Sequence, residues 1–249
     1  MSGKTYTQYL LDKYRSDFDA ATQHPFLLAT GDGSIDQAVL TQWLRQDYLY
    51  AYVGYLKFAS LLLSRLPLPT SPPGPDSSPR TQALGRAIPL LTFSLANIKR
   101  ETDFFVQTAQ DHGLDLHPQG RMPDAPGPDG LLGPYTALTR SYVDFLGATA
   151  AMGSLEDGLV LLWAMEKAYH TAWSYAKRFV PSQPAQSPKE AALRLFVDNW
   201  TCDEFVGFVR DCTDVVDGLE IDPDSETGKQ AEEVFKRTLW LEQRFWPSA

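Results

Sequence analysis

The sequence predicts an all-α protein, on two observations. Apolar residues recur at the three- and four-residue spacing of a helix in one segment after another, and strand-like alternation bounded by turns is nearly absent. The helical spacing covers residues 4–22, 36–66, 80–112, 135–152, 155–180, 188–198, 202–218 and 225–246. A chain of 249 residues is long enough for one large core, so we expect a single helical domain over residues 1–249.

Short breaks and two long loops separate the predicted helices. The His24-Pro25-Phe26 segment interrupts the first helical stretch, because proline disfavours helix in the residue before it, and a turn at 31–34 follows. Asp36 has the position of an N-cap for the next helix. Residues 67–79 contain six prolines and residues 114–133 are rich in proline, glycine and aspartate, so both are predicted to be long loops.

The composition argues against several classes of partner. The net charge is -9 and the pI is near 4.9, whereas nucleic acids and anionic membrane surfaces bind clustered lysine and arginine. No run approaches the roughly 20 apolar residues of a membrane span. The start of the sequence lacks the apolar stretch of a secretion signal. We therefore expect a cytoplasmic protein with no nucleic-acid or membrane partner.

The two cysteines, Cys202 and Cys212, are predicted to be free thiols. On one helix, ten residues at a rise of about 1.5 Å separate them by about 15 Å. A disulfide needs Cα atoms within roughly 7 Å of each other. Cys202 has the position of a helix start, and Cys212 is expected in the core.

Asp47 lies in an aromatic-rich segment, residues 43–52. At helical spacing Asp47, Tyr50 and Gly54 share one face, because they fall at i, i+3 and i+7. A glycine at that place lets a ligand or another helix approach the face. The alternative interpretation is an exposed aspartate beside core aromatics.

Two further carboxylates stand among apolar side chains. Glu166 shares a helical face with Tyr169 and Trp173, and Glu242 lies among four large apolar residues near the end of the sequence. A buried acid is costly unless it is paired, so an acid in such surroundings usually has a role. The alternatives are a surface pair between Glu166 and Lys167, and a terminal amphipathic helix with Glu242 on its exposed side.

The sequence predicts no metal site. The histidines at positions 24, 112, 117 and 170 lack the spacing of a zinc or di-iron helix motif. His24, beside Pro25, is interpreted as a helix-capping residue. The sequence also lacks a phosphate-binding glycine loop and the Gly-x-Ser-x-Gly elbow of hydrolases.

Taken in order, these features resemble the TenA (thiaminase II-like) family, and they span nearly the whole chain. The residues that carry the resemblance are His24-Pro25-Phe26, Gly33, Gln46-Asp47-Tyr48-Leu49-Tyr50, Tyr142, Glu166, Tyr169 and the terminal Glu242 with Phe245-Trp246. The resemblance implies a haem-oxygenase-like helical fold, a homotetramer or homodimer, and action on thiamin or its pyrimidine breakdown products. We expect no metal and no cofactor.

The resemblance also implies roles for single residues. The pyrimidine-holding aspartate of the family matches Asp47, and its catalytic glutamate near the C-terminus matches Glu242. The pocket aromatics of the family match Tyr50, Tyr142, Tyr169 and Trp200.

One departure separates two branches of the family. The thiaminase branch has a nucleophilic cysteine in a Pro-Cys motif, and the matching positions here are Ala164-Met165, followed by Glu166. The sequence therefore resembles the branch that lacks the cysteine and carries a second glutamate, which is associated with salvage of aminopyrimidines, including N-formylated ones. Glu166 and Glu242 are the expected catalytic residues, and which is acid and which is base stays open.

These residue types suit a 4-aminopyrimidine. Asp47 can accept from the exocyclic amine and bind ring N3 through its other oxygen, aromatic rings can cover the heterocycle, and two carboxylates can share the proton transfers of a hydrolysis. We predict hydrolysis of aminomethyl- or formylaminomethyl-aminopyrimidine toward hydroxymethylpyrimidine. Two alternatives stay open: a non-catalytic or regulatory aminopyrimidine-binding protein, and an oxidase-like member of the fold such as a quinone-cofactor synthase.

Overall fold

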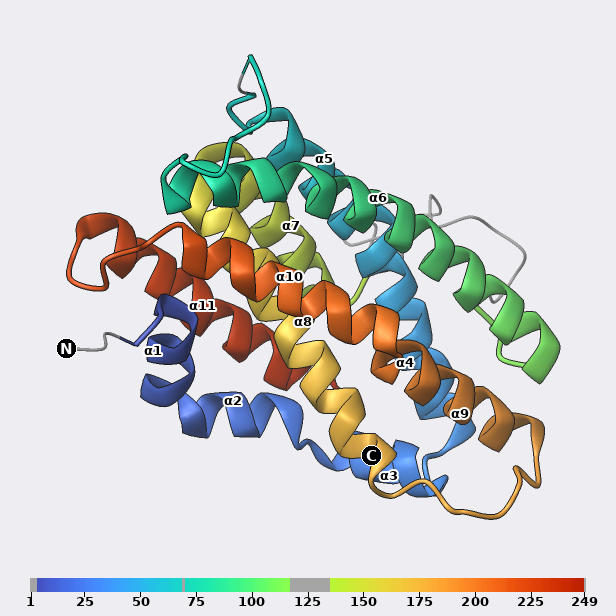
Figure 1. Cartoon of the computed structure of the whole chain (residues 1–249). Helices are drawn as coiled ribbons and strands as arrows, with labels where there is room; N and C mark the ends of the chain where they lie inside the picture. The colour runs from blue at the N-terminus through green and yellow to red at the C-terminus, as the bar shows by residue number, and fades with distance from the viewer. Residues whose placement is uncertain (1–3, 69, 117–134, 249) are drawn as a thin grey trace.

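The computed structural model describes residues 4–68, 70–116 and 135–248, and these residues contain helices and connections but no strand (Figure 1). The all-α prediction is confirmed. The elements are α1 (Tyr6–Lys13), α2 (Arg15–Thr22), α3 (Pro25–Asp32), α4 (Gln37–Leu49), the π-helical segment η1 (Tyr50–Tyr55), α5 (Leu56–Ser64), α6 (Pro79–His112), α7 (Ala137–Met152), α8 (Leu155–Lys177), α9 (Pro188–Thr201), α10 (Asp203–Gly218) and α11 (Glu226–Phe245).

The first predicted helix, residues 4–22, is two helices in the structure. The chain bends at Tyr14, whose φ of -113° and ψ of 32° leave the helical region. The predicted break at His24-Pro25-Phe26 is present, but it opens the short helix α3, which the sequence analysis missed. His24 caps this helix, as predicted: its Nδ1 accepts a hydrogen bond from the Phe26 main-chain N–H at 3.2 Å. Gly33 ends α3 at a φ of +81°, a conformation that favours glycine.

The predicted helix over residues 36–66 begins as expected and then changes type. The Asp36 side chain caps α4 by accepting from the main-chain N–H of Ala38 at 2.7 Å. After α4 the main-chain hydrogen bonds change from the i to i+4 pattern to the i to i+5 pattern of the π-helical segment η1, and α5 then returns to the α-helical pattern. The described residues of the predicted loop 67–79 contain no helix until α6 begins at Pro79. The second predicted loop, 114–133, lies almost entirely outside the described residues.

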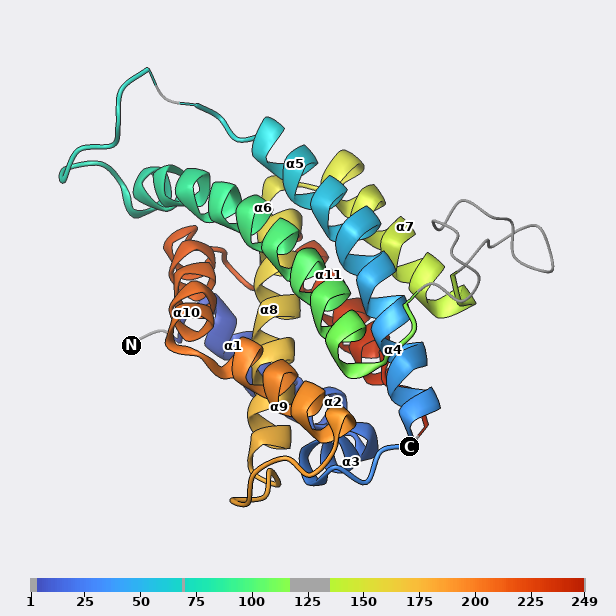
Figure 2. The ribbon, with the colours of Figure 1, turned by 90° about the vertical axis from the view of Figure 1, so that its right-hand side faces the viewer.

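The helix α8 occupies the middle of the bundle (Figures 1 and 2). It packs against α2, α3, α7, α9, α10 and α11. On another side, α4, η1 and α5 run end to end beside α6 and α7 (Figure 2). The buried apolar side chains form one cluster to which all the described helices contribute. None of the helices that the structure describes combines the length and the apolar character needed to cross a membrane.

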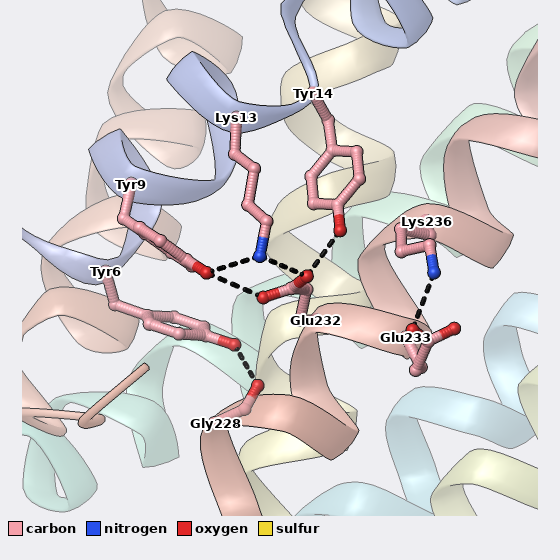
Figure 3. Close-up of polar contacts among 8 residues, drawn as sticks. All are labelled: Tyr6, Tyr9, Lys13, Tyr14, Gly228, Glu232, Glu233 and Lys236. Atoms are coloured by element: carbon pink, nitrogen blue, oxygen red, sulfur yellow. Dashed lines mark hydrogen bonds and ion pairs between the residues drawn. The ribbon is translucent and has the colours of Figure 1, made fainter. Parts of the chain in front are cut away.

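The N-terminal helix is fastened to α11 by a polar group that we call the Glu232 cluster: Tyr9, Lys13, Tyr14 and Glu232 (Figure 3). Glu232 accepts hydrogen bonds from Tyr9 Oη at 2.8 Å and from Tyr14 Oη, and pairs with Lys13 Nζ at 2.7 Å. Partial burial alone raises the pKa of Glu232, but the hydrogen bonds from Lys13 and the tyrosines outweigh it and hold that pKa below its ordinary value.

Candidate active site

A cavity with about 500 Å³ of space not filled by protein atoms lies between α4, η1 and α6 to α11. All seven residues proposed from the sequence as site residues line it: Asp47, Tyr50, Tyr142, Glu166, Tyr169, Trp200 and Glu242. The described lining also includes Ala51, Tyr55, Ile98, Glu101, Met165, Phe205 and Phe245. We call this space the inner cavity. Side chains from eight different elements meet here, although they are separated by up to about 200 residues in the chain.

The π-helical segment η1 places two tyrosines on the cavity. Tyr50 and Tyr55 are five residues apart, and in an α-helix such residues point about 140° apart. The wider i to i+5 ladder of a π-helix brings them closer to one side, and both line the inner cavity. Local departures of this kind are frequent at functional sites.

Gly54 serves helix packing. The sequence analysis left open whether a ligand or a helix approaches this glycine. A Cβ at Gly54 would lie 2.9 Å from Val143 Cγ2 and 3.2 Å from Leu146 Cδ1, so the neighbour is α7. The close packing of η1 on α7 holds the segment that carries Tyr50 and Tyr55.

Three of the carboxyl groups in the inner cavity are those predicted from the sequence, and all three are buried. Asp47 is 3% exposed, Glu166 8% and Glu242 4%. The alternative interpretations of these residues, an exposed aspartate, a surface pair with Lys167 and an exposed terminal glutamate, are therefore wrong. Burial without a paired cation makes the negative form of each acid costly.

Each carboxyl group of the inner cavity accepts a hydrogen bond from one aromatic side chain. The pairs are Tyr169 Oη to Asp47 Oδ2 at 2.6 Å, Trp200 Nε1 to Glu101 Oε1 at 2.9 Å, Tyr142 Oη to Glu242 Oε1 at 2.5 Å, and Tyr55 Oη to Glu166 Oε1. Within the described part of the chain, no group of three or more histidine, cysteine, aspartate or glutamate side chains is arranged to hold a metal ion. Four separate carboxyl–aromatic pairs thus surround one space.

Burial raises the pKa of all four acids toward neutrality. It raises the pKa of Asp47 and of Glu166 to about 7 against the opposing hydrogen bonds from Tyr169 and Tyr55. The pKa values of Glu101 and Glu242 rise to about 8, because charges on Asp47 and Glu166 add to burial. No lysine, arginine or histidine is among the described lining residues. Near pH 7 these groups can therefore both give and take protons.

Two lining residues, Glu101 and Tyr55, were missed by the sequence analysis. Glu101 had a usable signal, because Ile98, Glu101 and Phe105 fall at i, i+3 and i+7 on α6 with two apolar neighbours. Tyr55 had none, because its distance of five residues from Tyr50 lies off the face that α-helical spacing predicts.

Met165 is the residue that the resemblance matches to the family's cysteine, and its side chain ends in a thioether. Met165 lines the inner cavity, and its Sδ accepts a hydrogen bond from Tyr50 Oη at 2.8 Å. Both cysteines are free, as predicted: Cys202 is exposed at the start of α10, and Cys212 is buried within that helix. Neither is among the described residues that line the inner cavity.

Among proteins with curated descriptions, two are similar in sequence, and no protein-family model matches the chain. A protein of Fusarium pseudograminearum described as a "Probable transcription factor" is 29% identical over 280 aligned positions, which cover 96% of this chain and 51% of that protein. A "Probable bifunctional TENA-E protein" of Glycine max is 39% identical over 59 positions, 23% of this chain and 25% of that protein. The chain thus spans about half the length of the Fusarium relative.

Solved structures of TenA homologues superpose over nearly the whole chain. The homologue from Pyrococcus furiosus has a TM-score of 0.76 at 22% identity and covers 97% of this chain and 98% of its own. A TenA family transcription regulator from Silicibacter sp. TM1040 has a TM-score of 0.74 at 14% identity and covers 98% and 95%. The resemblance found in the sequence is thereby confirmed at the level of structure, and the chain has the all-helical fold of the TenA homologues.

Proposed function

We propose that the protein hydrolyses an aminopyrimidine derived from thiamin and releases hydroxymethylpyrimidine. One observation carries the proposal: Asp47, Glu166 and Glu242 are buried together among aromatic rings in one cavity. The substrates are pyrimidines with a 5-aminomethyl or 5-formylaminomethyl group. The names of the similar proteins support this assignment, because they include a TENA-E protein and TenA-like thiaminases.

Asp47 is the proposed pyrimidine-binding residue. Tyr169 holds one of its oxygens, and a carboxyl group can pair side by side with a ring nitrogen and an adjacent exocyclic amine. The raised pKa of Asp47, about 7, suits this role, because the protonated acid can donate to ring N3 while its carbonyl oxygen accepts from the amine. Tyr50, Tyr142 and Phe245, whose rings lie 4.9 to 6.1 Å apart, provide flat apolar surfaces.

Glu166 and Glu242 are the proposed acid and base. In hydrolysis of the aminomethyl group, the oxygen of water bonds to the methylene carbon as the carbon–nitrogen bond breaks. One carboxylate takes a proton from the water, and the other group, as a carboxylic acid, gives a proton to the departing nitrogen. Because the pKa values of Glu166 and Glu242 are about 7 and about 8, one protonated and one ionised group coexist near neutral pH.

The test is turnover of three substrates, followed by mass spectrometry: the aminomethylpyrimidine, its N-formyl derivative and thiamin. We expect hydroxymethylpyrimidine from at least one of the first two and little thiamin cleavage, because the thioether of Met165 cannot form a thiolate. Brisk thiamin cleavage that is lost in Cys202→Ser would overturn this assignment.

A second candidate is a regulatory protein that binds the aminopyrimidine without turning it over. It is favoured by the descriptions of two similar proteins, the Fusarium "Probable transcription factor" and the Silicibacter transcription regulator. Tight binding of hydroxymethylpyrimidine with no turnover of any of the three substrates would select this candidate.

We also propose that the chain forms a homodimer or homotetramer. Large side chains lie exposed on several helices, including Trp240 at 51% and Tyr52 at 40%. Light scattering should give a mass of at least twice the 27.8 kDa of one chain. A mass of one chain at micromolar concentration would refute this.

A further inference from the structure

When its acids are ionised, the inner cavity offers hydrogen-bond acceptors to a ligand and almost no donors. Its aromatic donors already donate to lining residues: Tyr50 to Met165, Tyr55 to Glu166, Tyr142 to Glu242, Tyr169 to Asp47 and Trp200 to Glu101. Each of the four hydrogen bonds that an acid accepts occupies one oxygen of its carboxyl group. Within the described residues the second oxygen of each acid accepts no hydrogen bond, and none of these oxygens is fully enclosed without a partner, so they face the open space. A complementary ligand is rich in N–H groups.

The charge of the lining residues also favours a ligand that is rich in N–H groups. Four carboxyl groups and no cationic side chain are found among the described lining residues. A carboxylate is stabilised by an opposite charge nearby, so a positively charged ligand relieves the cost that burial imposes on these acids. The proposed reaction uses three of the four, Asp47, Glu166 and Glu242. Glu101 has no part in it.

Glu101 lies where the inner cavity meets a second one. This outer cavity, with about 390 Å³ of space not filled by protein atoms, has Asn97, Arg100, Cys202 and Glu204 among its lining residues. Among the described residues only Glu101 and Phe205 line both cavities. Glu101 is partly exposed, in contrast to the other three acids. A substituent that extends from a bound pyrimidine toward the outer cavity therefore meets Glu101.

The side chain of Arg100, the residue before Glu101, is bonded to other groups. Arg100 pairs with Glu204 at 2.8 Å and donates to Asn97 Oδ1 at 2.6 Å, both on the exposed side. Trp200 Nε1 holds one oxygen of Glu101 and fixes its direction. The other oxygen is left for a ligand.

We propose that Glu101 binds the protonated aminomethyl group of the substrate and makes the site select this cation over neutral pyrimidines. The inference rests on the proposed function, because it takes an aminopyrimidine to occupy the inner cavity. An ammonium group supplies three donors and a charge. Its positive charge favours the ionised form of Glu101, so the acid ionises when this ligand binds. Before the carbon–nitrogen bond breaks, the ammonium group passes one proton to an ionised carboxyl group of the proton-transfer pair, which returns it to the departing nitrogen. Hydrolysis leaves a neutral hydroxyl in place of the ammonium group, so the product binds Glu101 more weakly than the substrate, which favours release.

The test is calorimetric binding of two probes, the 5-aminomethyl- and the 5-hydroxymethyl-pyrimidine, to wild type and Glu101→Gln. Glutamine retains an oxygen that can accept from Trp200 and removes only the charge. We expect affinity for the aminomethyl probe to fall about 10-fold or more, the loss of a charge-assisted bond, while affinity for the hydroxymethyl probe changes less than about threefold. Asp103→Asn is the matched control, since this exposed acid on α6 pairs with Lys99, and should bind both probes like wild type.

Each other outcome overturns the inference. Equal loss for both probes would show that Glu101 only shapes the cavity, and no loss for either would remove it from the ligand. If wild type binds the hydroxymethyl probe but Glu101→Gln changes the affinity for the two probes by the same factor, the proposed function stands and this inference fails. If wild type binds neither probe, both fail.

Discussion

Glu232 and acids of the inner cavity both receive hydrogen bonds from tyrosines, but among the described residues only Glu232 has a cation beside it. In the Glu232 cluster, Lys13 lies 2.7 Å from the carboxylate and the pKa of Glu232 is lowered (Figure 3). In the inner cavity the acids accept hydrogen bonds from aromatic side chains, and no lysine, arginine or histidine is among the described lining residues. Burial therefore raises their pKa values to about 7 or 8.

The difference lies in what stabilises the charge. A carboxylate next to an ammonium group stays ionised over the physiological range and joins two helices. An acid paired with a neutral hydroxyl changes its protonation near neutral pH and is available to a ligand or a reaction. Glu232 thus has the environment of a structural residue, and Glu166 and Glu242 have that of a proton-transfer pair.

The largest expected effect is on turnover. Glu166→Gln and Glu242→Gln should each lower hydrolysis of the preferred pyrimidine about 10²–10⁴-fold, because each removes one proton transfer. Glu232→Gln is the matched control on α11 and should keep turnover within about threefold of wild type at a temperature where the variant is folded. Wild-type rates in either cavity variant would remove that glutamate from the mechanism.

The next largest effect is on binding. Asp47→Asn should weaken hydroxymethylpyrimidine about 10- to 150-fold, because an amide cannot exchange a proton with ring N3 as a carboxyl group of pKa about 7 can, and so loses the charge-assisted hydrogen bond. Circular dichroism should show an unchanged helical content. An affinity equal to that of wild type in calorimetry would exclude Asp47 from the site.

A smaller effect, with opposite signs in the two regions, is expected on stability. The folded-state pKa of Glu242, about 8, lies above its ordinary value of 4.5, so folding binds a proton and the ligand-free protein loses stability as pH rises from 5 to 8. Glu242→Gln removes this loss. The melting temperature of the variant minus that of wild type should therefore increase by a few degrees from pH 5 to pH 8.

Glu232→Gln should behave in the opposite way in the same melting experiments. The pKa of Glu232 is lowered, so its stabilising effect is present above the ordinary pKa and is lost as pH falls through the folded-state value. The variant should melt below wild type by a constant amount from pH 5 to 8, and the two should converge in acid. A parallel pH response of Glu232→Gln and Glu242→Gln would contradict the comparison.

The smallest effect is expected for Lys13→Met. Lys13 is largely exposed, so water and salt already screen its charge. Its removal should raise the pKa of Glu232 and move the midpoint of acid unfolding upward by a fraction of a pH unit, with little change in the melting temperature at pH 7. A midpoint that does not move would assign the lowered pKa of Glu232 to the tyrosines alone.

Long periodic segments were predictable from the sequence, and short or irregular ones were not. The runs that became α6, α8 and α10 have several turns of clear periodicity, so their bounds differ from the prediction by a few residues. The helix α3 has only eight residues, and five of them are buried, so it shows no polar face. The bend at Tyr14 interrupts a stretch in which the apolar spacing continues, so local spacing does not reveal it.

The site divides in the same way. Asp47 and Glu242 could be proposed because each stands beside large apolar residues and matches a family motif. Glu101 escaped attention because Lys99, Arg100 and Asp103 around it make its segment look like an exposed face. The structure shows that α6 turns this acid toward the inner cavity, on the face of Ile98 and Phe105, while its charged neighbours remain exposed.

The π-helical segment η1 contains an extra residue compared with an α-helix that makes the same connection. The extra residue lies on the side of η1 that faces away from the inner cavity, where Tyr52 is 40% and Val53 36% exposed. Deletion of Val53 would leave Tyr50 and Tyr55 four positions apart, the spacing that an ordinary α-helix places on one face. This stretch of helix can therefore shorten by one position without separating its two cavity tyrosines, a tolerance of length that proteins usually confine to surface loops.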